Sequence, residues 1–438
     1  MALTLIEKYP GCKDKPVKII TRQTLSDREK ALLAGFFVLD ELLEWQDKKS
    51  IHTLCLSIRE RDLWIACDCL DSAIQPVFRI NRAVSGNLYL HRITSRKNHA
   101  PSCLFKENGN PSVDRKASQR APMLYSEKPF NLLGKESRDL IRQNSGADRG
   151  DSEQKARVPT LGKVLYTLLE KARLNTVSGS PTLPPWQALR DAASHLMLTD
   201  SLPLVDHLEL NPAKIAYRSL LLKKDLNWGK KQQKHCLCLL HVKSFTAKSL
   251  EVIYADKTTK PLEIATRIYV SSGRFSERTG PYMALVLIST TAEEPWFYRP
   301  VNAYVLPAYS HTSFLPMDSF YEREFMRCLF RLYYAAQKKG RPFQVIKPLF
   351  DIAVLANEEK PSLVLPDFLI RRGGQTLVVE VNGSNEPAYL ERKERTQALM
   401  KHLGDFLCLD AWLAESKQQL SEELTRFMRT IEQWLGGV

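Results

Sequence analysis

The sequence predicts a multidomain α/β protein, with a small β module at the amino end and a mixed sheet flanked by helices at the carboxyl end. Three observations lead to this prediction. The chain of 438 residues is too long for one ordinary hydrophobic core. Residues 1–105 contain short alternating segments, IHTLCLSI and DLWIACDC, that are typical of strands. From residue 301 onward, helical and strand-like patterns follow one another. Two or three domains are therefore expected.

Composition places the predicted boundaries. Residues 106–160 are poor in apolar side chains and rich in Ser, Asn, Gly and Pro, which predicts a linker or a mobile insertion after the β module of residues 1–105. Residues 161–300 predict a mixed α/β middle region. There the amphipathic pattern TLGKVLYTLLEKARLN comes first, and strand-like stretches such as HCLCLLHVKSF and YMALVLI follow. Residues 301–438 form the last predicted domain.

Charge and missing motifs narrow the class of function. The 63 basic and 49 acidic residues give a net charge of +14, which favours a polyanionic partner, most simply nucleic acid; a basic protein without such a partner is the alternative. The sequence has no Walker loop, dinucleotide-binding glycine fingerprint or serine-hydrolase elbow, which argues against ATP motors, dehydrogenases and serine hydrolases. It also has no signal-like start and no apolar run near the roughly 20 residues that span a bilayer, so a cytoplasmic protein without a membrane partner is expected.

Two carboxylates mark the strand-like segments LPDFLI and LVVEV. Asp367 lies at the start of the first predicted strand and Glu380 at the end of the second, with RRGGQ as the predicted turn. Antiparallel pairing across this turn would bring both carboxylates to one sheet edge. Carboxylates hold the hard divalent cations that activate water and neutralise phosphate charge, and a charge buried within VVEV is costly unless it is paired or metal-bound. The pattern predicts a Mg²⁺ or Mn²⁺ site; a solvent-exposed Glu380 on an alternating strand is the alternative.

The usual core of a metal-dependent nuclease has a lysine two residues beyond the second acid, and here that position is Asn382. The helix predicted from Pro387 to Gly404 offers Lys393 instead. At about 100° per residue, Lys393 falls inside the apolar arc of this helix and so points toward the sheet. Its ammonium could then orient the attacking water or stabilise charge on phosphate. The alternative is a lysine that extends along the helix edge into solvent.

A helix predicted over residues 319–339 supplies a third carboxylate, Glu322, within its apolar stripe; the ordinary preference for acids at a helix N-terminus explains it equally well. The order of this helix, PDFLI, VVEV and a helix with YLERK resembles the PD-(D/E)XK nuclease superfamily. The resemblance implies a restriction-endonuclease-like mixed sheet and Mg²⁺-dependent phosphodiester hydrolysis. It also implies that Asp367 and Glu380 bind the metal, that Glu322 assists, and that Lys393 stands for the migrated lysine known in some branches.

The segment VVEVNG…PAYLERKERT also resembles the sequences of a family of uncharacterised bacterial proteins carried on integrative and conjugative elements. This second resemblance extends over much of the chain. It implies a DNA endonuclease of a mobile genetic element, with DNA as substrate and a protein partner from the same element. Asn382 favours the alternative, a non-catalytic DNA-binding or scaffold protein that retains the nuclease fold. RNA as the substrate also stays open.

The amino-terminal module contains a set of metal-ligand residue types. WIACDC supplies Cys67 and Cys69, and KNHAPSCLF supplies His99 and Cys103. Three thiolates and one imidazole are the ligands of a closed, structural tetrahedral Zn²⁺ site, so the spacing predicts a zinc-binding module. His91 ranks below His99 because its position in LYLHRI is typical of a strand residue. The alternative is small buried cysteines beside a surface histidine.

The stretch RSLLLKKDLNWGKKQQKH in the middle region predicts a nucleic-acid contact. Lys223, Lys224, Lys230 and Lys231 offer charge to phosphates, and Trp228 could stack on a base or ribose. A solvated loop is the alternative. The similar composition of HCLCLLH, just after this stretch, is attributed to a strand whose cysteines share one buried face.

Overall fold

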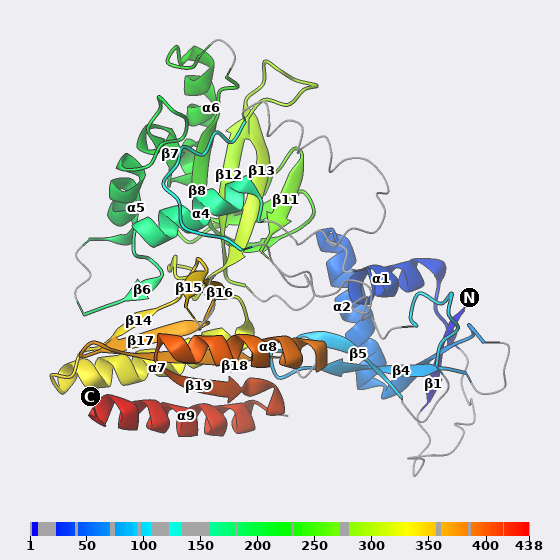
Figure 1. Cartoon of the computed structure of the whole chain (residues 1–438). Coiled ribbons are helices and arrows are strands. Elements are labelled where there is room, and N and C mark those ends of the chain that lie inside the picture. Colours follow the sequence, from blue (N-terminus) through cyan, green and yellow to red (C-terminus); the bar gives the residue numbers. More distant parts are fainter. Residues whose placement is uncertain are drawn as a thin grey trace. The chain divides into compact units, whose positions relative to one another are not determined.

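The structure is a computed structural model of the whole chain (Figure 1). It divides into two compact units, one built around residues 1–117 and the other around residues 118–272 and 279–438. Among the residues described, no helix is both long and apolar enough to span a bilayer. The structure describes residues 2–7, 23–39, 43–70, 75–93, 98–106, 122–133, 158–179, 183–229, 232–271, 280–355, 361–383, 387–414 and 416–437.

The first unit combines an antiparallel sheet of order β2-β1-β3-β4-β5 with two helices. Apolar side chains of both helices and of the sheet share one hydrophobic core. The unit is therefore a mixed α/β module rather than a β module. Its elements are β1 (Leu3–Glu7), β2 (Gln23–Thr24), α1 (Asp27–Phe37), α2 (Trp45–Glu60), β3 (Leu63–Cys67), β4 (Val77–Arg82) and β5 (Leu88–Arg92).

The expectation that IHTLCLSI forms a strand was wrong, because the segment lies within helix α2. Its buried residues are Ile51, Cys55 and Ile58, at the i, i+4 and i+7 spacing of one helix face. Leu54, Leu56 and Ile58 recur at every second position, which mimics strand alternation over this short segment. The polar first half of α2 hides the longer helical period. The following segment, DLWIACDC, does form a strand, β3, and every residue of β3 is buried.

The middle part of the second unit is built on a seven-stranded sheet of order β10-β9-β8-β12-β13-β11, with β7 also paired to β8. HCLCLLHVKSF forms strand β8, and Cys236 and Cys238 are both buried there, as expected for core residues. Helices α4 and α5 pack on this sheet in one continuous apolar core. The elements are α4 (Thr160–Lys171), α5 (Pro185–Ser194), β7 (Leu208–Glu209), α6 (Ile215–Lys224), β8 (Cys236–Phe245), β9 (Ser249–Ile253), β10 (Thr259–Glu263), β11 (Arg267–Val270), β12 (Tyr282–Ser289) and β13 (Arg299–Pro307).

Part of the predicted linker packs against this core. Met123 and Leu132 are buried in it. The backbone N–H of Met123 donates to Asp351 Oδ2 at 2.5 Å, and the N–H of Asp351 donates back to the Met123 carbonyl at 3.0 Å. Residues 122–133 are therefore a structured strap, which a composition average over residues 106–160 could not separate from its surroundings. The rest of the predicted linker, apart from residues 106 and 158–160, lies outside the described residues.

The carboxyl-terminal part is a sheet of order β19-β18-β17-β14-β6 between helices. The pairs β6–β14, β14–β17 and β17–β18 are antiparallel, and the pair β18–β19 is parallel. The edge strand β6 comes from the middle region. The elements are β6 (Thr176–Val177), α7 (Phe320–Lys338), β14 (Gln344–Ile346), the hairpin β15 (Ile352–Val354) and β16 (Ser362–Val364), β17 (Phe368–Arg372), β18 (Gln375–Asn382), α8 (Pro387–Met400), β19 (Asp405–Asp410) and α9 (Lys417–Gly437).

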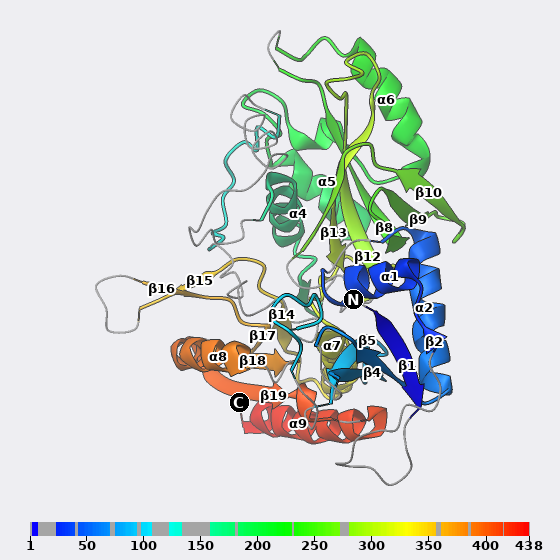
Figure 2. The same cartoon turned by 90° about the vertical axis from the view of Figure 1, so that its right-hand side faces the viewer.

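Helices cover both faces of this sheet, and β19 lies between α8 and α9 in the two views of Figures 1 and 2. On one face, Phe325 of α7 packs on Phe368 of β17 with ring centroids 5.0 Å apart, and α9 packs beside α7. On the other face, Met400 of α8 clusters with Val378 of β18. Because side chains alternate along a strand, Glu380 lies on the same face as Val378. The acid of β18 therefore faces α8.

Glycines fix two connections of this sheet. Gly373 and Gly374, with φ of 56° and 82°, form the two-residue turn between β17 and β18. Positive φ at both positions is what such a tight hairpin requires. Gly404 has a φ of 153°, and a Cβ there would collide with the carbonyl oxygen of Thr376. A glycine at this position therefore lets the chain leave α8 and enter β19 directly beside β18.

Candidate functional site

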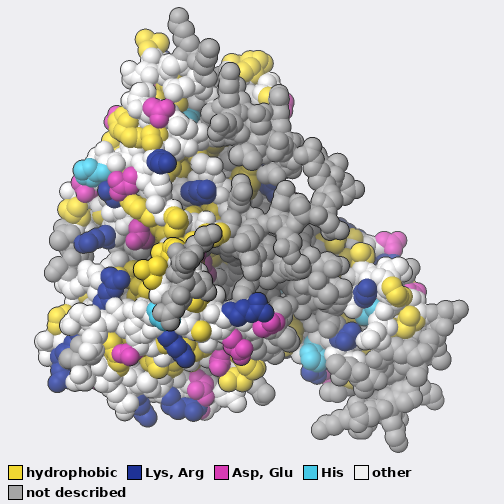
Figure 3. Space-filling model, viewed as in Figure 1, with side chains coloured by type: hydrophobic (Ala, Val, Ile, Leu, Met, Phe, Trp, Pro, Cys, Tyr) yellow, Lys and Arg dark blue, Asp and Glu magenta, His cyan; other side chains and the backbone are white. Residues whose placement is uncertain are grey.

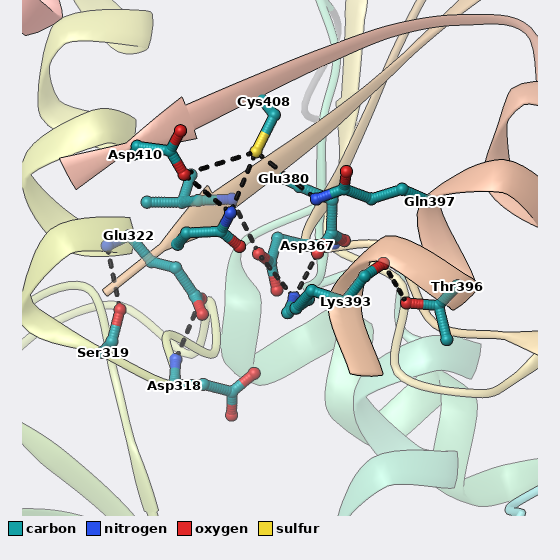
Figure 4. Close-up of polar contacts among 12 residues, drawn as sticks. Asp318, Ser319, Glu322, Asp367, Glu380, Lys393, Thr396, Gln397, Cys408 and Asp410 are labelled. Carbon is teal, nitrogen blue, oxygen red and sulfur yellow. Dashed lines mark hydrogen bonds and ion pairs between the residues drawn. The ribbon is translucent and has the colours of Figure 1, made fainter. Parts of the chain in front are cut away.

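The two predicted acids meet at the edge of the β17–β18 hairpin (Figure 4). Phe368 pairs with Val379, which places Asp367 next to Glu380. The backbone N–H of Asp367 donates to Glu380 Oε1 at 3.0 Å, and the N–H of Val381 donates to Asp367 Oδ2 at 2.9 Å. The side chain of Glu380 is fully buried, whereas that of Asp367 is 16% exposed. Each carboxylate is thus held by a backbone N–H group of the neighbouring strand, at or next to the other acid.

Lys393 reaches this pair from α8. Its Nζ donates to Glu380 Oε2 and lies 3.7 Å from Asp367 Oδ2. Only 16% of the Lys393 side chain is exposed, so it does not extend along the helix edge into solvent. Figure 4 shows the ammonium pointing at both carboxylates. The structure therefore brings together the two acids and the lysine named from the sequence.

Asn382 occupies the position two residues beyond Glu380 and makes contacts with β19. Its Nδ2 donates to Asp410 Oδ1 at 2.9 Å and to Cys408 Sγ at 3.0 Å. Parallel pairing explains these contacts, because Asn382 lies opposite Asp410 in the register. The buried Oδ1 of Asn382 has no hydrogen-bond partner in the part of the chain that the structure describes. Asn382 therefore ties β18 to β19 on the face that carries Glu380.

The acids of the α7 N-terminus join the site through a lysine that the sequence analysis did not identify. Ser319 caps α7, and Glu322 is 4% exposed. Lys347 Nζ donates to Glu322 Oε2 at 2.7 Å, and it lies 2.9 Å from Asp318 Oδ2 and 3.9 Å from Asp367 Oδ1. Glu322 therefore contacts Lys347 directly and connects with Asp367 through it. One signal for Lys347 was available: a single charge inside the apolar stretch VIKPLF.

Burial governs the protonation of these groups. Removal from water, together with the nearby Asp367, raises the pKa of Glu380 to about 7, against the opposing effect of Lys393. Burial likewise raises the pKa of Glu322. For Lys347, burial alone would lower the pKa, but the surrounding carboxylates outweigh it and raise the pKa, so this side chain stays an ammonium. Ionisation of Glu380 and Glu322 therefore has an energetic cost, which a bound cation would lower.

The donor set fits a divalent metal ion. Four carboxylates and two ammonium groups leave the fully ionised cluster with a net charge of −2. Carboxylate oxygens are the ligands that Mg²⁺ and Mn²⁺ prefer. Asp367 and Glu380 would hold the ion. The charged groups of the cluster are Asp318, Glu322, Lys347, Asp367, Glu380 and Lys393.

A second cluster lies in the amino-terminal unit. The ligand atoms of Cys67, Cys69, His99 and Cys103 all lie within 4.8 Å of one another. Cys67 Sγ is 3.7 Å from Cys103 Sγ, and His99 Nδ1 is 3.4 Å from Cys69 Sγ and 3.3 Å from Cys103 Sγ. At Zn–S bonds of about 2.3 Å, tetrahedral geometry separates two sulfurs by roughly 3.8 Å. The four residues can therefore hold a metal ion such as zinc.

Burial changes the pKa values of the histidine and of the cysteines in opposite directions. It lowers the pKa of His99 to about 4, with a smaller contribution from Arg92, so the imidazole is neutral and free to ligate near pH 7. It raises the pKa of the Cys67 and Cys103 thiols, which therefore stay protonated until a cation stabilises the thiolate. His91, the spare candidate, lies on strand β5 and is exposed. The cluster thus uses His99, as expected.

Trp228 is not available to stack on a base. It is 8% exposed, and its ring contacts His207 and His235 with centroids 5.1 and 4.7 Å away. Its Nε1 donates to Asp225 Oδ2 at 3.1 Å. The predicted stacking role for Trp228 is therefore corrected: the indole anchors the segment after α6 to the core of the middle sheet. A tryptophan within a basic stretch can be buried or exposed, and the sequence pattern does not distinguish the two.

The lysines of the basic stretch divide into two pairs. Lys223 and Lys224 are exposed at the carboxyl end of α6. Lys230 and Lys231 lie outside the described residues. On the face drawn in Figure 3, basic and acidic side chains are interspersed among the described residues. The exposed pair is therefore available to a phosphate backbone.

Three family models match successive parts of the chain. A restriction endonuclease-like C-terminal domain matches residues 318–433. Two domains of unknown function, DUF8534 and DUF8535, match residues 12–108 and 122–308. A search of curated proteins found no match, and the resemblance to proteins of integrative and conjugative elements stays a prediction. The carboxyl-terminal part of the chain has a nuclease-like fold.

Proposed function

We propose that the chain is a metal-dependent nuclease that hydrolyses phosphodiester bonds in DNA. The observation that carries this proposal is the position of Lys393, whose ammonium contacts Glu380 and lies 3.7 Å from Asp367. A lysine and two strand-end acids on one face of the sheet supply both a cation site and a hydrogen-bond donor. The match to a restriction endonuclease-like domain supports the same reaction class.

Each residue has a distinct role in the proposed reaction. Asp367 and Glu380 hold Mg²⁺ or Mn²⁺ through their carboxylate oxygens. A bound divalent ion lowers the pKa of a water molecule and neutralises phosphate charge. Lys393 donates hydrogen bonds from Nζ, either to the attacking water or to a phosphate oxygen, and so orients the nucleophile or stabilises the charge that develops. Glu322 assists indirectly, because it fixes Lys347 beside Asp367.

Nucleic acid is the proposed partner. A net charge of +14 favours a polyanion. Lys223 and Lys224 are exposed and would contact the phosphate backbone. DNA is preferred over RNA because of the resemblance to proteins of conjugative elements. The same resemblance supports a partner protein from a mobile element and a cytoplasmic location.

The Cys67, Cys69, His99 and Cys103 cluster is proposed to bind structural Zn²⁺. Four protein ligands leave no open coordination position for a substrate or an activated water. Three of the four ligands are buried, which also favours a structural role. Zinc there would tie the end of β3 to the loop that contains His99.

A cleavage assay tests the nuclease proposal. Labelled single-stranded DNA, double-stranded DNA and RNA are incubated with Mg²⁺ or Mn²⁺ and the full chain. Asp367→Asn, Glu380→Gln and Lys393→Met should each abolish or strongly reduce cleavage, whereas Lys401→Met, an exposed lysine just after α8, should not. Cleavage that survives both acid substitutions would refute the assignment of the site.

The competing function is a non-catalytic DNA-binding or scaffold protein. Asn382 favours it, because this residue bonds to β19 where a nuclease usually has its lysine. Under this alternative the wild type binds DNA, and no metal ion or variant changes the length of the DNA. A result of that kind would leave the nuclease-like fold with a binding role only.

A further inference from the structure

We propose that Lys347 fills the place of a second cation, so that the acidic cluster accepts a single divalent ion, at its Asp367–Glu380 end. The inference rests on the proposed function and deepens it, because it sets how many ions that site takes. It assigns Lys347 as a positioning residue that does not touch the substrate.

Lys347 lies where a second ion would have to bind. Its Nζ is 2.7 Å from Glu322 Oε2, 2.9 Å from Asp318 Oδ2 and 3.9 Å from Asp367 Oδ1. These three carboxylates would be the ligands of an ion beside the first one. The side chain is 4% exposed, and its Nζ also lies over the ring of Phe368, 5.2 Å from the centroid. An ammonium in this position already supplies the positive charge that those acids require.

The backbone of Lys347 is fixed from the middle region. The N–H of Lys347 donates to the carbonyl of Asn175 at 2.8 Å, and Asn175 Nδ2 donates to the carbonyl of Lys347 at 2.9 Å. Asn175 is 1% exposed and immediately precedes strand β6, which pairs with β14. Two buried hydrogen bonds therefore fix the backbone of Lys347, and its side chain, which is 4% exposed, is packed on the way to the acids.

The two lysines approach Asp367 from opposite faces of the sheet. Ile346 pairs with Leu369, so the next residue, Lys347, lies on the same face as Phe368, which α7 covers. Lys393 comes from α8 on the other face. Lys347 lies near Asp367 Oδ1 and Lys393 near Asp367 Oδ2. One ion at the α8 face can share Asp367 with Lys347, whereas a second ion would have to displace this lysine.

Charge balance leads to the same count. A bound cation favours the ionised form of all four acids, and with both lysines charged the cluster then carries −2. One divalent cation neutralises it, and a second would leave +2 in a largely buried site, which is costly. Removing the charge of Lys347 would make the cluster −3 and open a second cation position.

Direct counting of bound Mn²⁺ tests this. The full chain is loaded with one equivalent of Zn²⁺ to occupy the cysteine cluster and freed of unbound Zn²⁺, which would otherwise compete for the carboxylates. It is then titrated with Mn²⁺ and followed by electron paramagnetic resonance and calorimetry. The wild type should bind one Mn²⁺ that is lost in the double variant Asp367→Asn/Glu380→Gln. A count of two ions lost in that double variant would overturn the inference without any further variant.

Variants of Lys347 provide the second arm. Lys347→Gln should bind a second, weaker Mn²⁺, and the double variant Lys347→Gln/Glu322→Gln should return to one ion, because a ligand of the opened position is lost. Circular dichroism and retention of the first Mn²⁺ report whether Lys347→Gln is folded. A folded Lys347→Gln that still binds one ion overturns the inference; if it does not fold, the wild-type count decides.

The outcomes separate this inference from the nuclease proposal. One bound Mn²⁺ without cleavage of any nucleic acid sustains the inference and refutes the nuclease function. Cleavage with two site-bound ions does the reverse. If no Mn²⁺ binds at the acids, the metal dependence fails and both proposals fall.

Discussion

The buried charge of Glu380 predicts that the metal-free Glu380→Gln variant becomes more stable relative to wild type as the pH rises. Its pKa is raised from the ordinary 4.5 to about 7, mainly by burial, even with Lys393 in contact. At about 1.4 kcal/mol per tenfold change in proton affinity, the difference corresponds to roughly 3 kcal/mol of unfolding free energy. The side chain is fully buried, so solvent does not screen this cost.

The sign follows from which state binds the proton more tightly. Below pH 4.5 the carboxyl is protonated in both the folded and the unfolded chain. Between 4.5 and about 7 the folded chain keeps the proton and the unfolded chain does not, so stability falls as the pH rises through this window. Glutamine stays neutral throughout. The stability of Glu380→Gln relative to wild type should therefore rise by about 3 kcal/mol between acidic and alkaline pH.

Urea unfolding in EDTA at pH 5 and pH 8 measures this difference. Glu391→Gln is the matched control, because Glu391 lies on α8 with a side chain that is 66% exposed and should leave both unfolding free energies unchanged. Adding Mg²⁺ at pH 8 should stabilise the wild type and not Glu380→Gln, since only the wild type keeps both ligands. A Glu380→Gln variant that is no more stable, relative to wild type, at pH 8 than at pH 5 would refute the reasoning.

Four further outcomes are expected. Lys393→Met should lower the rate of DNA cleavage by roughly 10²–10³-fold, and Lys393→Arg should restore part of it; equal rates would exclude a role for this ammonium. Asn175→Ala should lower the unfolding free energy by about 1–3 kcal/mol, because it leaves the buried carbonyl of Lys347 without its donor, as denaturant titration would reveal. Cys69→Ser should reduce the bound zinc, measured by elemental analysis, well below one ion per chain, whereas Cys55→Ser, in the same core but outside the cluster, should not. Gly404→Ala should cost at least about 1–3 kcal/mol from positive φ and the collision with Thr376, and an unchanged melting temperature would contradict it.

The acid hairpin could be predicted from the sequence because each of its signals is local. RRGGQ specifies a two-residue turn, since glycine adopts positive φ at both positions without strain. Once that turn is set, strand alternation decides that Asp367 and Glu380 meet. The inward direction of Lys393 followed from helical periodicity in the same way. These three residues needed no knowledge of distant parts of the chain.

Lys347 was missed because its environment is not local. Its partners come from α7, from β17 and from the segment before β6, and Asn175 lies 172 residues away in the sequence. A lysine after a three-residue strand gives no periodic signal of its own. The same limit applies to Trp228, whose burial depends on His207 and His235. In both cases tertiary packing decides that the side chain is buried.

Catalysis does not require a lysine at position 382, because helix α8 supplies one to the same face of β18. Glu380 and Asn382 share this face, since they are two residues apart on one strand. Asn382 bonds to Asp410 of the parallel strand β19 and so helps hold the sheet at the site. Helix α8 covers the same face through Met400, which brings Lys393 to Glu380. The ammonium at the site thus comes from a helix instead of a strand, and its position depends on how α8 packs on the sheet.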